Sequence, residues 1–358
     1  GSSALFHNPA ALTGIDYLQF SAYYTLNAPT QESGHLAALS ENGEVQTTSA
    51  MAPLNMILVF PNTNLEYADL GLAYGVGFSQ YYPRVNEYTW TYQENGASHS
   101  RTLERSPGIN VLHLGAGFEV WKALKMGLTF HFIPRTEYFS KDVLYTDDAY
   151  VTGLAETFST NNALFFRFGA LYNLGQSLAL GFTLVSPFEW VASEYWTNED
   201  TTPREISLHR TPLTVGYGLA FTKGALRAQY EGSFYKYSQS EHRGELIEMD
   251  DGSGTRIGLE YGSTAKFRMG YYSESMPVRN SAETLPVPMT GLTFGFGYSF
   301  GKLSIDLALD HYSWTNDAFI QPMLPQVIAL EDQISGNIFV AELSYKFVDG
   351  LPEILSSK

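Results

Sequence analysis

The sequence has 358 residues, with 37 acidic and 21 basic side chains, and its formal net charge of −16 excludes a surface built to bind nucleic acid. It contains no cysteine, which excludes disulfides, thiolate metal sites and cysteine catalysis. Aromatic residues make up 15% and charged residues only 16% of the chain, a balance that excludes a disordered protein.

The chain begins with a short segment that contains a proline. Residues 2–12 read SSALFHNPAAL, and Asn8-Pro9-Ala10 stands just before the first stretch of alternating apolar residues, which starts at Ile15. This segment could be a turn that starts a sheet, or an element packed inside a larger structure. Because the alternation begins only after it, residues 1–14 form the first predicted unit.

After this unit, apolar residues alternate with polar or small residues over almost the whole chain, and no long amphipathic helix pattern occurs. In 124–140, for example, Met126 and Leu128 share one face, while Gly127 and Thr129 lie on the other. The alternation predicts about fourteen strands. They span 15–28, 51–60, 69–82, 108–121, 124–140, 161–174, 177–191, 205–221, 224–238, 254–262, 265–275, 288–300, 302–314 and 337–347.

The connections between these strands alternate in length. Short turns such as 122–124 and 222–224 alternate with long polar loops. The long loops are 28–50, 83–107, 141–160, 192–204, 239–253, 275–287 and 315–336. No run of about 18 apolar residues offers a transmembrane helix. The pattern therefore predicts an all-β fold, a transmembrane antiparallel β-barrel of about fourteen strands with its short turns at one end, rather than a soluble sandwich or propeller.

Both ends of the predicted barrel carry aromatic residues, as the girdles at a membrane interface require. The last strand ends on Phe347, after Ser-Tyr-Lys, which is similar to the terminal signal of barrels inserted into the outer membrane. The sequence thus predicts three parts: a segment of residues 1–14, a barrel of residues 15–347, and a tail of residues 348–358.

Charged residues of both signs fall on the faces predicted to point into the barrel. They are Arg135, Arg167, Arg227, Glu231, Arg256, Glu260, Arg268, Asp306, Asp310, Glu342 and Lys346. Opposite charges in a closed interior usually pair with one another, and a barrel of this size is too narrow for a wide aqueous pore. The interior is therefore expected to be filled, and residues 1–14 are the candidate filling.

The sequence predicts neither an enzyme nor a cofactor or metal site. It has no G-x-S-x-G elbow, H-E-x-x-H pair, phosphate-binding loop or dinucleotide fingerprint. His113 and His131 face inward on adjacent predicted strands and, with Glu119, could form a site. A hydrogen-bonded network inside the barrel is the other interpretation.

The first unit carries a resemblance to a known family. The stretch A-L-F-x-N-P-A-A-L resembles the N-terminal part of the FadL/TodX family of outer-membrane transporters for hydrophobic compounds. RTPLTVGYGLAF (210–221) and TGLTFGFGYSFGKLSIDLALDHYSW (290–314) look like matching strand pairs of that family. The resemblance implies a barrel plugged by an N-terminal hatch, with Asn8, Pro9 and Ala10 as its motif.

The resemblance also implies a route for the ligand. A long-chain fatty acid or another hydrophobic molecule would enter from outside, reach a site behind the hatch, and leave sideways at a kinked third strand. The matching strand here is 69–82, in which Gly71, Gly75 and Gly77 share one face. The candidate residues for binding the ligand inside the barrel are Arg135, Arg167, Arg227, Arg268, His113 and His131.

By the same resemblance, the protein is expected in the outer membrane of a diderm bacterium, as a monomer with both termini periplasmic, in contact with a fatty acid-like ligand, detergent or lipid. A second interpretation stays open. The same fold resembles the PorV-like accessory barrel of type IX secretion, which would bind a protein partner through its external loops.

Overall fold

The computed structural model describes most of the chain. The described residues are 3–29, 32–36, 41–47, 51–60, 71–81, 87–94, 97–105, 109–135, 137–146, 149–160, 162–196, 204–242, 245–246, 250–279, 286–316 and 330–347. The predicted tail of residues 348–358 lies outside them.

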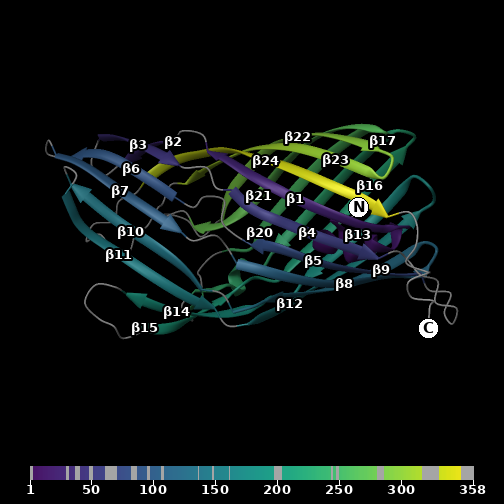
Figure 1. Ribbon diagram of the computed structural model, residues 1–358, viewed down its shortest axis with the longest axis horizontal. Helices are drawn as coiled ribbons and strands as arrows, with labels where there is room; N and C mark the ends of the chain where they lie inside the picture. The colour runs from purple at the N-terminus through teal and green to yellow at the C-terminus, as the bar shows by residue number, and fades with distance from the viewer. Residues whose placement is uncertain are drawn as a thin grey trace.

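Fourteen strands close into one antiparallel barrel, as the alternating pattern predicts (Figure 1). In order around the barrel they are β1 (Leu18–Pro29), β4 (Met51–Phe60), β5 (Leu72–Tyr81), β8 (Ile109–Trp121), β9 (Leu124–Ile133), β12 (Ala163–Leu174), β13 (Leu178–Val185), β16 (Thr214–Lys223), β17 (Leu226–Tyr235), β20 (Gly252–Gly262), β21 (Ala265–Arg279), β22 (Pro286–Phe300), β23 (Leu303–Asn316) and β24 (Leu330–Phe347). The barrel closes where β1 pairs with β24, in a register that runs from Leu18 opposite Phe347 to Pro29 opposite Gly336.

The outward face of the barrel is a band of large apolar side chains. Ile257 on β20 is 54% exposed and Phe294 on β22 is 52% exposed. Apolar exposure on this scale would be unfavourable in water, but it is the expected outer surface of a barrel surrounded by lipid. The fold is therefore a transmembrane β-barrel.

Short turns connect neighbouring strands at one end of the barrel. Gly175, Gly224 and Gly301 occupy such turns with φ values of 71°, 59° and 60°, the left-handed region that glycine enters without steric cost. The same end holds Leu18 and Phe347, where the barrel sheet begins and ends.

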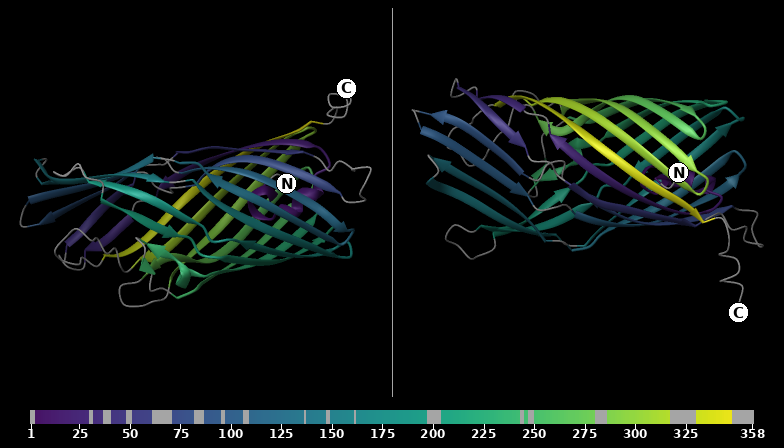
Figure 2. Two further views of the ribbon diagram at one scale, coloured as in Figure 1. Left: turned by 90° about the horizontal axis from the view of Figure 1, so that it is seen from below. Right: turned by 45° about the horizontal axis from the view of Figure 1, so that its top comes forward.

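The predicted long loops are largely strands, which corrects the sequence prediction. These strands are β2 (Glu32–Leu36), β3 (Glu41–Thr47), β6 (Glu87–Glu94), β7 (Ala97–Arg105), β10 (Glu137–Thr146), β11 (Ala149–Thr160), β14 (Glu189–Trp196), β15 (Arg204–Arg210), β18 (Glu241–His242) and β19 (Glu245–Leu246). From β24, neighbours pair in the order β2, β3, β6, β7, β10, β11, β14 and β15, forming an extension beyond the end of the barrel that lies opposite the short turns (Figure 2). Several of these strands, such as β7 with the sequence ASHSRTLER, carry no sustained apolar alternation, so their sequences read as loops.

Three predicted strands are each divided in two by a proline. The predicted strands 124–140, 177–191 and 205–221 break at Pro134, at Pro187 and at Pro212. Proline has no N–H to donate to the ladder, so the barrel strand ends there and an extension strand begins nearby.

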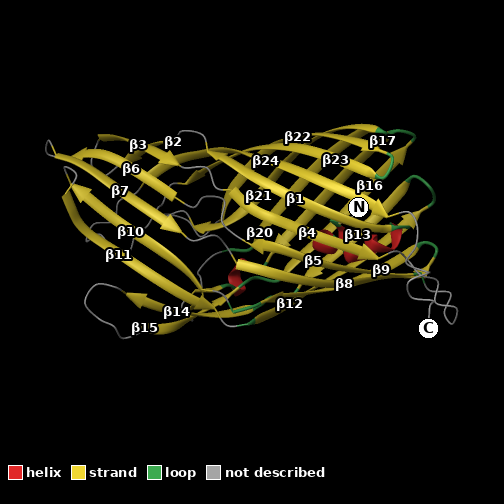
Figure 3. Cartoon of the chain, in the orientation of Figure 1, coloured by secondary structure: helices red, strands yellow, loops and turns green. Residues whose placement is uncertain are grey.

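The described helices are short, and none has the length and apolar character to cross a membrane. Helix α1 (Ala4–His7) and the 3₁₀ helix η1 (Pro9–Gly14) lie inside the barrel (Figure 3). The 3₁₀ helix η2 (Tyr237–Gln239) follows β17. Beside it, hydrogen bonds from Lys236 and Ser238 lower the pKa of the Asp251 carboxyl.

Candidate functional site

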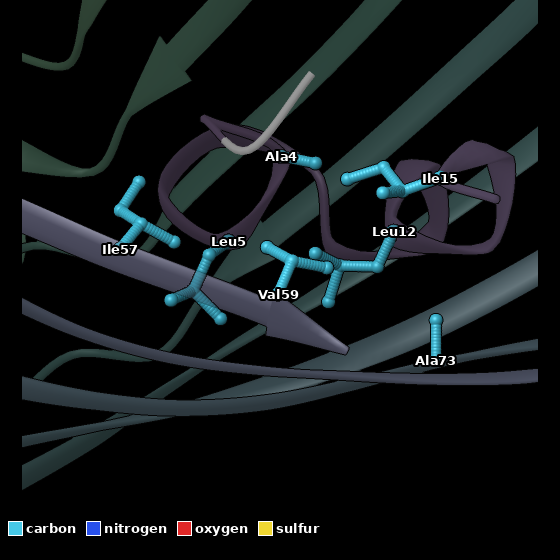
Figure 4. Packing of buried hydrophobic residues seen from close by; sticks show 7 residues of the cluster. All are labelled: Ala4, Leu5, Leu12, Ile15, Ile57, Val59 and Ala73. Carbon is cyan, nitrogen blue, oxygen red and sulfur yellow. The ribbon is translucent and has the colours of Figure 1, made fainter. Parts of the chain in front are cut away.

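The N-terminal segment, residues 4–14, packs against one inner wall of the barrel. Leu5 and Leu12 have no exposed surface. They form a cluster with Ile57 and Val59 of β4 and Ala73 of β5 (Figure 4). Burial of each leucine side chain contributes about 1.5–3 kcal/mol, so apolar packing is the main attraction between the segment and the wall.

The wall beside this segment is lined with glycines. They are Gly75 and Gly77 of β5, Gly115 and Gly117 of β8, Gly127 of β9 and Gly169 of β12. A Cβ atom at Gly127 would lie 2.4 Å from the carbonyl carbon of Pro9, and one at Gly77 would lie 2.8 Å from Leu5 Cδ2. The segment therefore reaches the wall only because these positions lack side chains.

The three glycines singled out in the sequence have different positions. Gly75 and Gly77 face Leu5 from β5. Gly71 immediately precedes that strand, and its carbonyl accepts a hydrogen bond from the Glu119 N–H at 2.9 Å. β5 pairs with β8 over its whole length without a register shift, so no kink is present in that pairing.

Asn8, Pro9 and Ala10 tie the segment to two strands of the wall. The Asn8 amide Nδ2 donates to the carbonyl oxygens of Ala170 on β12 and Phe182 on β13, each at 3.3 Å. Asn8 Oδ1 accepts from the Ala10 N–H at 3.1 Å and so caps η1, while Pro9 occupies the first turn, where its missing N–H costs nothing.

Two side chains of the wall bind the last carbonyls of α1. Thr129 of β9 donates to the Leu5 carbonyl at 3.2 Å. Arg167 of β12 donates to the carbonyl of Phe6 and, at 3.1 Å, to that of His7. A cation near the C-terminal carbonyls of a helix is electrostatically favourable. Arg167, predicted as a candidate for binding a ligand carboxylate, thus contacts the N-terminal segment itself.

His113 and His131 lie next to each other in register on β8 and β9, as predicted. Their Nδ1 atoms are 2.6 Å apart, and His113 Nε2 lies 2.6 Å from Ser79 Oγ. Phe6 of the N-terminal segment meets the His113 ring edge-on at 4.6 Å between centroids. The histidines therefore form a hydrogen-bonded pair under the segment.

Glu119 is separate from this histidine pair. It lies six residues further along β8 from His113, opposite Lys125. Of the other predicted arginines, Arg135 is exposed just beyond β9, whereas Arg227 of β17 and Arg268 of β21 line one cavity away from the histidine pair.

The opposite wall of the barrel contains a charged cavity of about 490 Å³. The ionised groups of this cavity, the charged chamber, are Arg227, Arg256, Arg268, Glu231, Glu260, Glu274 and Asp310. Arg256 donates to both carboxylate oxygens of Glu274, at 2.9 and 3.1 Å, and Arg268 donates to Glu260 at 2.6 Å. The pairing expected for interior charges is thus confirmed for these residues.

Within the described ranges, no group of three or more His, Cys, Asp or Glu side chains is arranged to hold a metal ion. The polar groups nearest the N-terminal segment bind its backbone and one another. The arrangement holds an apolar segment against the inner wall of the barrel.

Known proteins resemble this chain in structure rather than in sequence. No family model matches the sequence. No curated protein matches it either. Solved structures match over nearly the full chain. A Pseudomonas aeruginosa FadL homologue is 14% identical, with 97% of this chain and 94% of that chain covered and a TM-score of 0.62.

Two toluene transporters give similar values. TodX of Pseudomonas putida is 14% identical, with 98% of this chain and 95% of that chain covered and a TM-score of 0.62. TbuX of Ralstonia pickettii is 12% identical, with coverage of 97% and 94% and a TM-score of 0.59. The fold is that of the FadL and TodX channels. These neighbours are transporter channels, not enzymes.

Two side chains that contact the site, Thr129 and Ser79, could not be predicted from the sequence, because a single hydroxyl in a strand does not indicate its hydrogen-bond partner. The glycines of β8, β9 and β12 did give a signal: they recur on inward-facing positions of neighbouring strands. Such a glycine surface indicates the close approach of another backbone.

Proposed function

We propose that this protein is a channel for passive uptake of hydrophobic small molecules across the outer membrane of a diderm bacterium. The observation that carries the proposal is the apolar N-terminal segment seated against a glycine wall inside a transmembrane barrel of FadL type. Long-chain fatty acids are one candidate ligand class. The toluene transporters among the structural neighbours support small aromatic hydrocarbons as the other.

The N-terminal segment is proposed to act as a hatch, with Asn8, Pro9 and Ala10 as its anchor. It contacts one wall of the barrel, and its polar attachments are few: the Asn8 amide, Thr129 and Arg167. Each such bond contributes about 0.5–3 kcal/mol, and the burial of Leu5 and Leu12 adds to this, so a ligand would displace the segment by competing for the apolar wall that holds it.

A sideways exit is proposed at the seam between β4 and β5. β5 pairs with β8 over ten residues, whereas among the described residues its pairing with β4 covers five, from Tyr74 to Phe78. Leu5 lies directly behind Gly77 near the end of this short pairing. An apolar solute gains about 0.8 kcal/mol per CH₂ group on entering the bilayer rather than water, so exit into lipid is favourable.

The proposed orientation puts the short turns, both termini and the N-terminal segment on the periplasmic side, and the extension outside the cell. Short periplasmic turns and longer external connections are the usual arrangement of outer-membrane barrels. A single chain closes the barrel, which supports a monomer.

The second candidate function is a PorV-like accessory role in protein secretion. One observation favours it: the predicted external loops form a sheet of eight strands from β2 to β15, a large surface for a protein partner. A partner bound there, with no uptake of hydrophobic molecules, would select this role.

Deletion of Asn8, Pro9 and Ala10 tests the main proposal. Uptake of a labelled fatty acid and of toluene is measured in proteoliposomes containing the full chain or the deletion variant. We expect the uptake rate to change at least severalfold while the barrel stays folded, as judged by its heat-modifiable migration on gels. Unchanged kinetics for both solutes in the folded variant would refute the role of the hatch, and no uptake by the full chain would refute the transport function.

A further inference from the structure

The interior of the barrel has two chemically different halves. The N-terminal segment covers the wall formed by β4, β5, β8, β9 and β12. The charged chamber belongs to the opposite wall, formed by β17, β20, β21, β22 and β23. The segment therefore fills one side of the barrel interior and leaves the charged side to another occupant.

Water is the occupant that suits the charged chamber. The side chains of Arg256 and Arg268 remain 50% and 34% exposed even though each donates to a carboxylate. Displacing water from ionised groups without replacing its hydrogen bonds costs several kcal/mol for each group. A volume of about 490 Å³ holds on the order of ten water molecules.

The charged chamber extends along part of the membrane thickness. On β21 it reaches from Arg268, near the short turns, to Glu274, a span of about 20 Å along the strand. Because the strands of such barrels are tilted by about 35–45°, this span corresponds to about 15 Å along the barrel axis. The apolar band of an outer-membrane barrel is about 25 Å tall. The strands beside its outer end stop at Thr214, where β16 starts, and at Tyr235, where β17 ends; beyond them β15 and β18 contact each other through the single described pair Arg210 and Glu241.

The wall between the chamber and the N-terminal segment carries small inward-facing residues. Gly181 and Thr183 of β13 lie opposite Gly218 and Gly216 of β16 in register. Gly218 in turn lies opposite Glu231 of β17, at the edge of the chamber. Gly181 and Gly218 carry no side chain, so little side-chain volume separates the chamber from the segment at this level.

We propose that the charged chamber conducts small hydrated ions and other small hydrophilic solutes through the barrel while the N-terminal segment stays seated. The barrel then has two routes: one for apolar molecules along the glycine wall and one for ions along the charged wall. The chamber has four carboxylates against three guanidinium groups, which predicts a slight preference for cations. This proposal depends on the transmembrane barrel and not on the uptake of hydrophobic ligands.

Planar lipid bilayers in KCl test the proposal with a matched pair of variants. Gln229 lines the chamber, and its neighbour Ala228 points to the opposite face of β17. We expect steady single-channel conductance from the unmodified protein, a roughly twofold or larger decrease for Gln229→Trp, and no change for Ala228→Trp. The absence of conductance in the unmodified protein, or equal conductance in Gln229→Trp and Ala228→Trp, would overturn the proposal.

A charge reversal inside the chamber provides a second test, which measures ion selectivity. Glu231→Lys adds a cation at the edge of the chamber, so the reversal potential in a KCl gradient is expected to shift toward anion selectivity, because substitutions inside a barrel tune its selectivity. Glu231→Gln, expected to shift it less, serves if the lysine variant does not fold. An unshifted potential in both folded variants would place the current elsewhere and reject the chamber as its path.

The proposed ion pathway and the proposed uptake function can be refuted independently of each other. Fatty acid and toluene uptake is measured on the same Gln229→Trp protein, and we expect it to match the unmodified protein. Conductance without any uptake would contradict only the proposed hydrophobic transport. Conductance that appears only after deletion of Asn8, Pro9 and Ala10 would place the ion path in the site of the N-terminal segment and overturn the separate chamber route.

Discussion

Gly127 is the residue at which the wall and the N-terminal segment come closest. A Cβ atom there would lie within 2.6 Å of three backbone atoms of Pro9 and Ala10. Backbone atoms inside a capped 3₁₀ turn cannot move aside as the end of a flexible side chain can. The absence of one methyl group therefore decides whether the segment fits.

Gly127→Ala is expected to displace the N-terminal segment at a cost of about 1–3 kcal/mol, the usual range for overpacking. Hydrogen exchange of residues 4–14, followed by mass spectrometry, should show faster exchange than in the unmodified protein. Gly181→Ala is the matched control, since its Cβ would meet its nearest neighbour, Leu171 Cδ2, at an ordinary 3.5 Å. Equal exchange in both variants would show that the close approach at Gly127 does not hold the segment in place.

His113 and His131 illustrate what a residue pattern predicts well. Their inward direction and their adjacency follow from period-two alternation and from the pairing of consecutive strands across a short turn. The contacts that these histidines make with other parts of the chain could not be predicted from the sequence. Phe6 meets His113 from a segment more than one hundred positions away, and no local pattern encodes that contact.

At the scale of elements, β5 has two unequal borders. Its hydrogen-bonded register with β8 is complete, and its register with β4 stops at Met56 opposite Phe78. β4 contains Pro53, which has no N–H to donate beyond that point. The β4–β5 border is therefore the weaker of the two.

A reversible disulfide tests this border, because the chain contains no native cysteine. Met56→Cys with Phe78→Cys joins β4 to β5, and we expect oxidation to lower the uptake of a hydrophobic solute severalfold and a reductant to restore it. Phe78→Cys with Leu112→Cys joins β5 to β8 and serves as control, with uptake unaffected by oxidation. The same inhibition by both disulfides would contradict an exit at the β4–β5 border.

The strand prediction succeeded for the strands of the barrel and failed for those of the extension. The barrel strands carry apolar outward positions, so their existence follows from sequence. Extension strands such as β7, with the sequence ASHSRTLER, lack such a face. Their pairing depends on continuing the register of strands already held in the barrel, which is tertiary information.

For the whole molecule, the surrounding lipid determines which substitutions are tolerated. Phe294 and Thr293 are adjacent on β22; Phe294 is exposed on the outward face, and Thr293 lines the charged chamber. One charge placed at either position tests the inside–outside assignment of the entire barrel.

Phe294→Arg is expected to destabilise the barrel by about 2–4 kcal/mol, the cost of a cation near the bilayer midplane. Thr293→Arg is expected to cost much less, because its charge enters the hydrated chamber beside Asp310. Denaturant-induced unfolding from lipid vesicles measures both. A larger loss of stability for Thr293→Arg than for Phe294→Arg would invert the assignment of faces.

The sequence by itself determined the barrel, its approximate strand number, the inward histidine pair and the segment expected to fill the interior. These properties depend on alternation and on short turns, which involve residues close in the chain. Only the tertiary structure decided that Asn8 binds the carbonyls of β12 and β13, that Arg167 binds α1, and that the charges gather on the opposite wall. The contacts of Asn8 and Arg167 join residues more than one hundred positions apart, and closing the barrel is what brings these residues together.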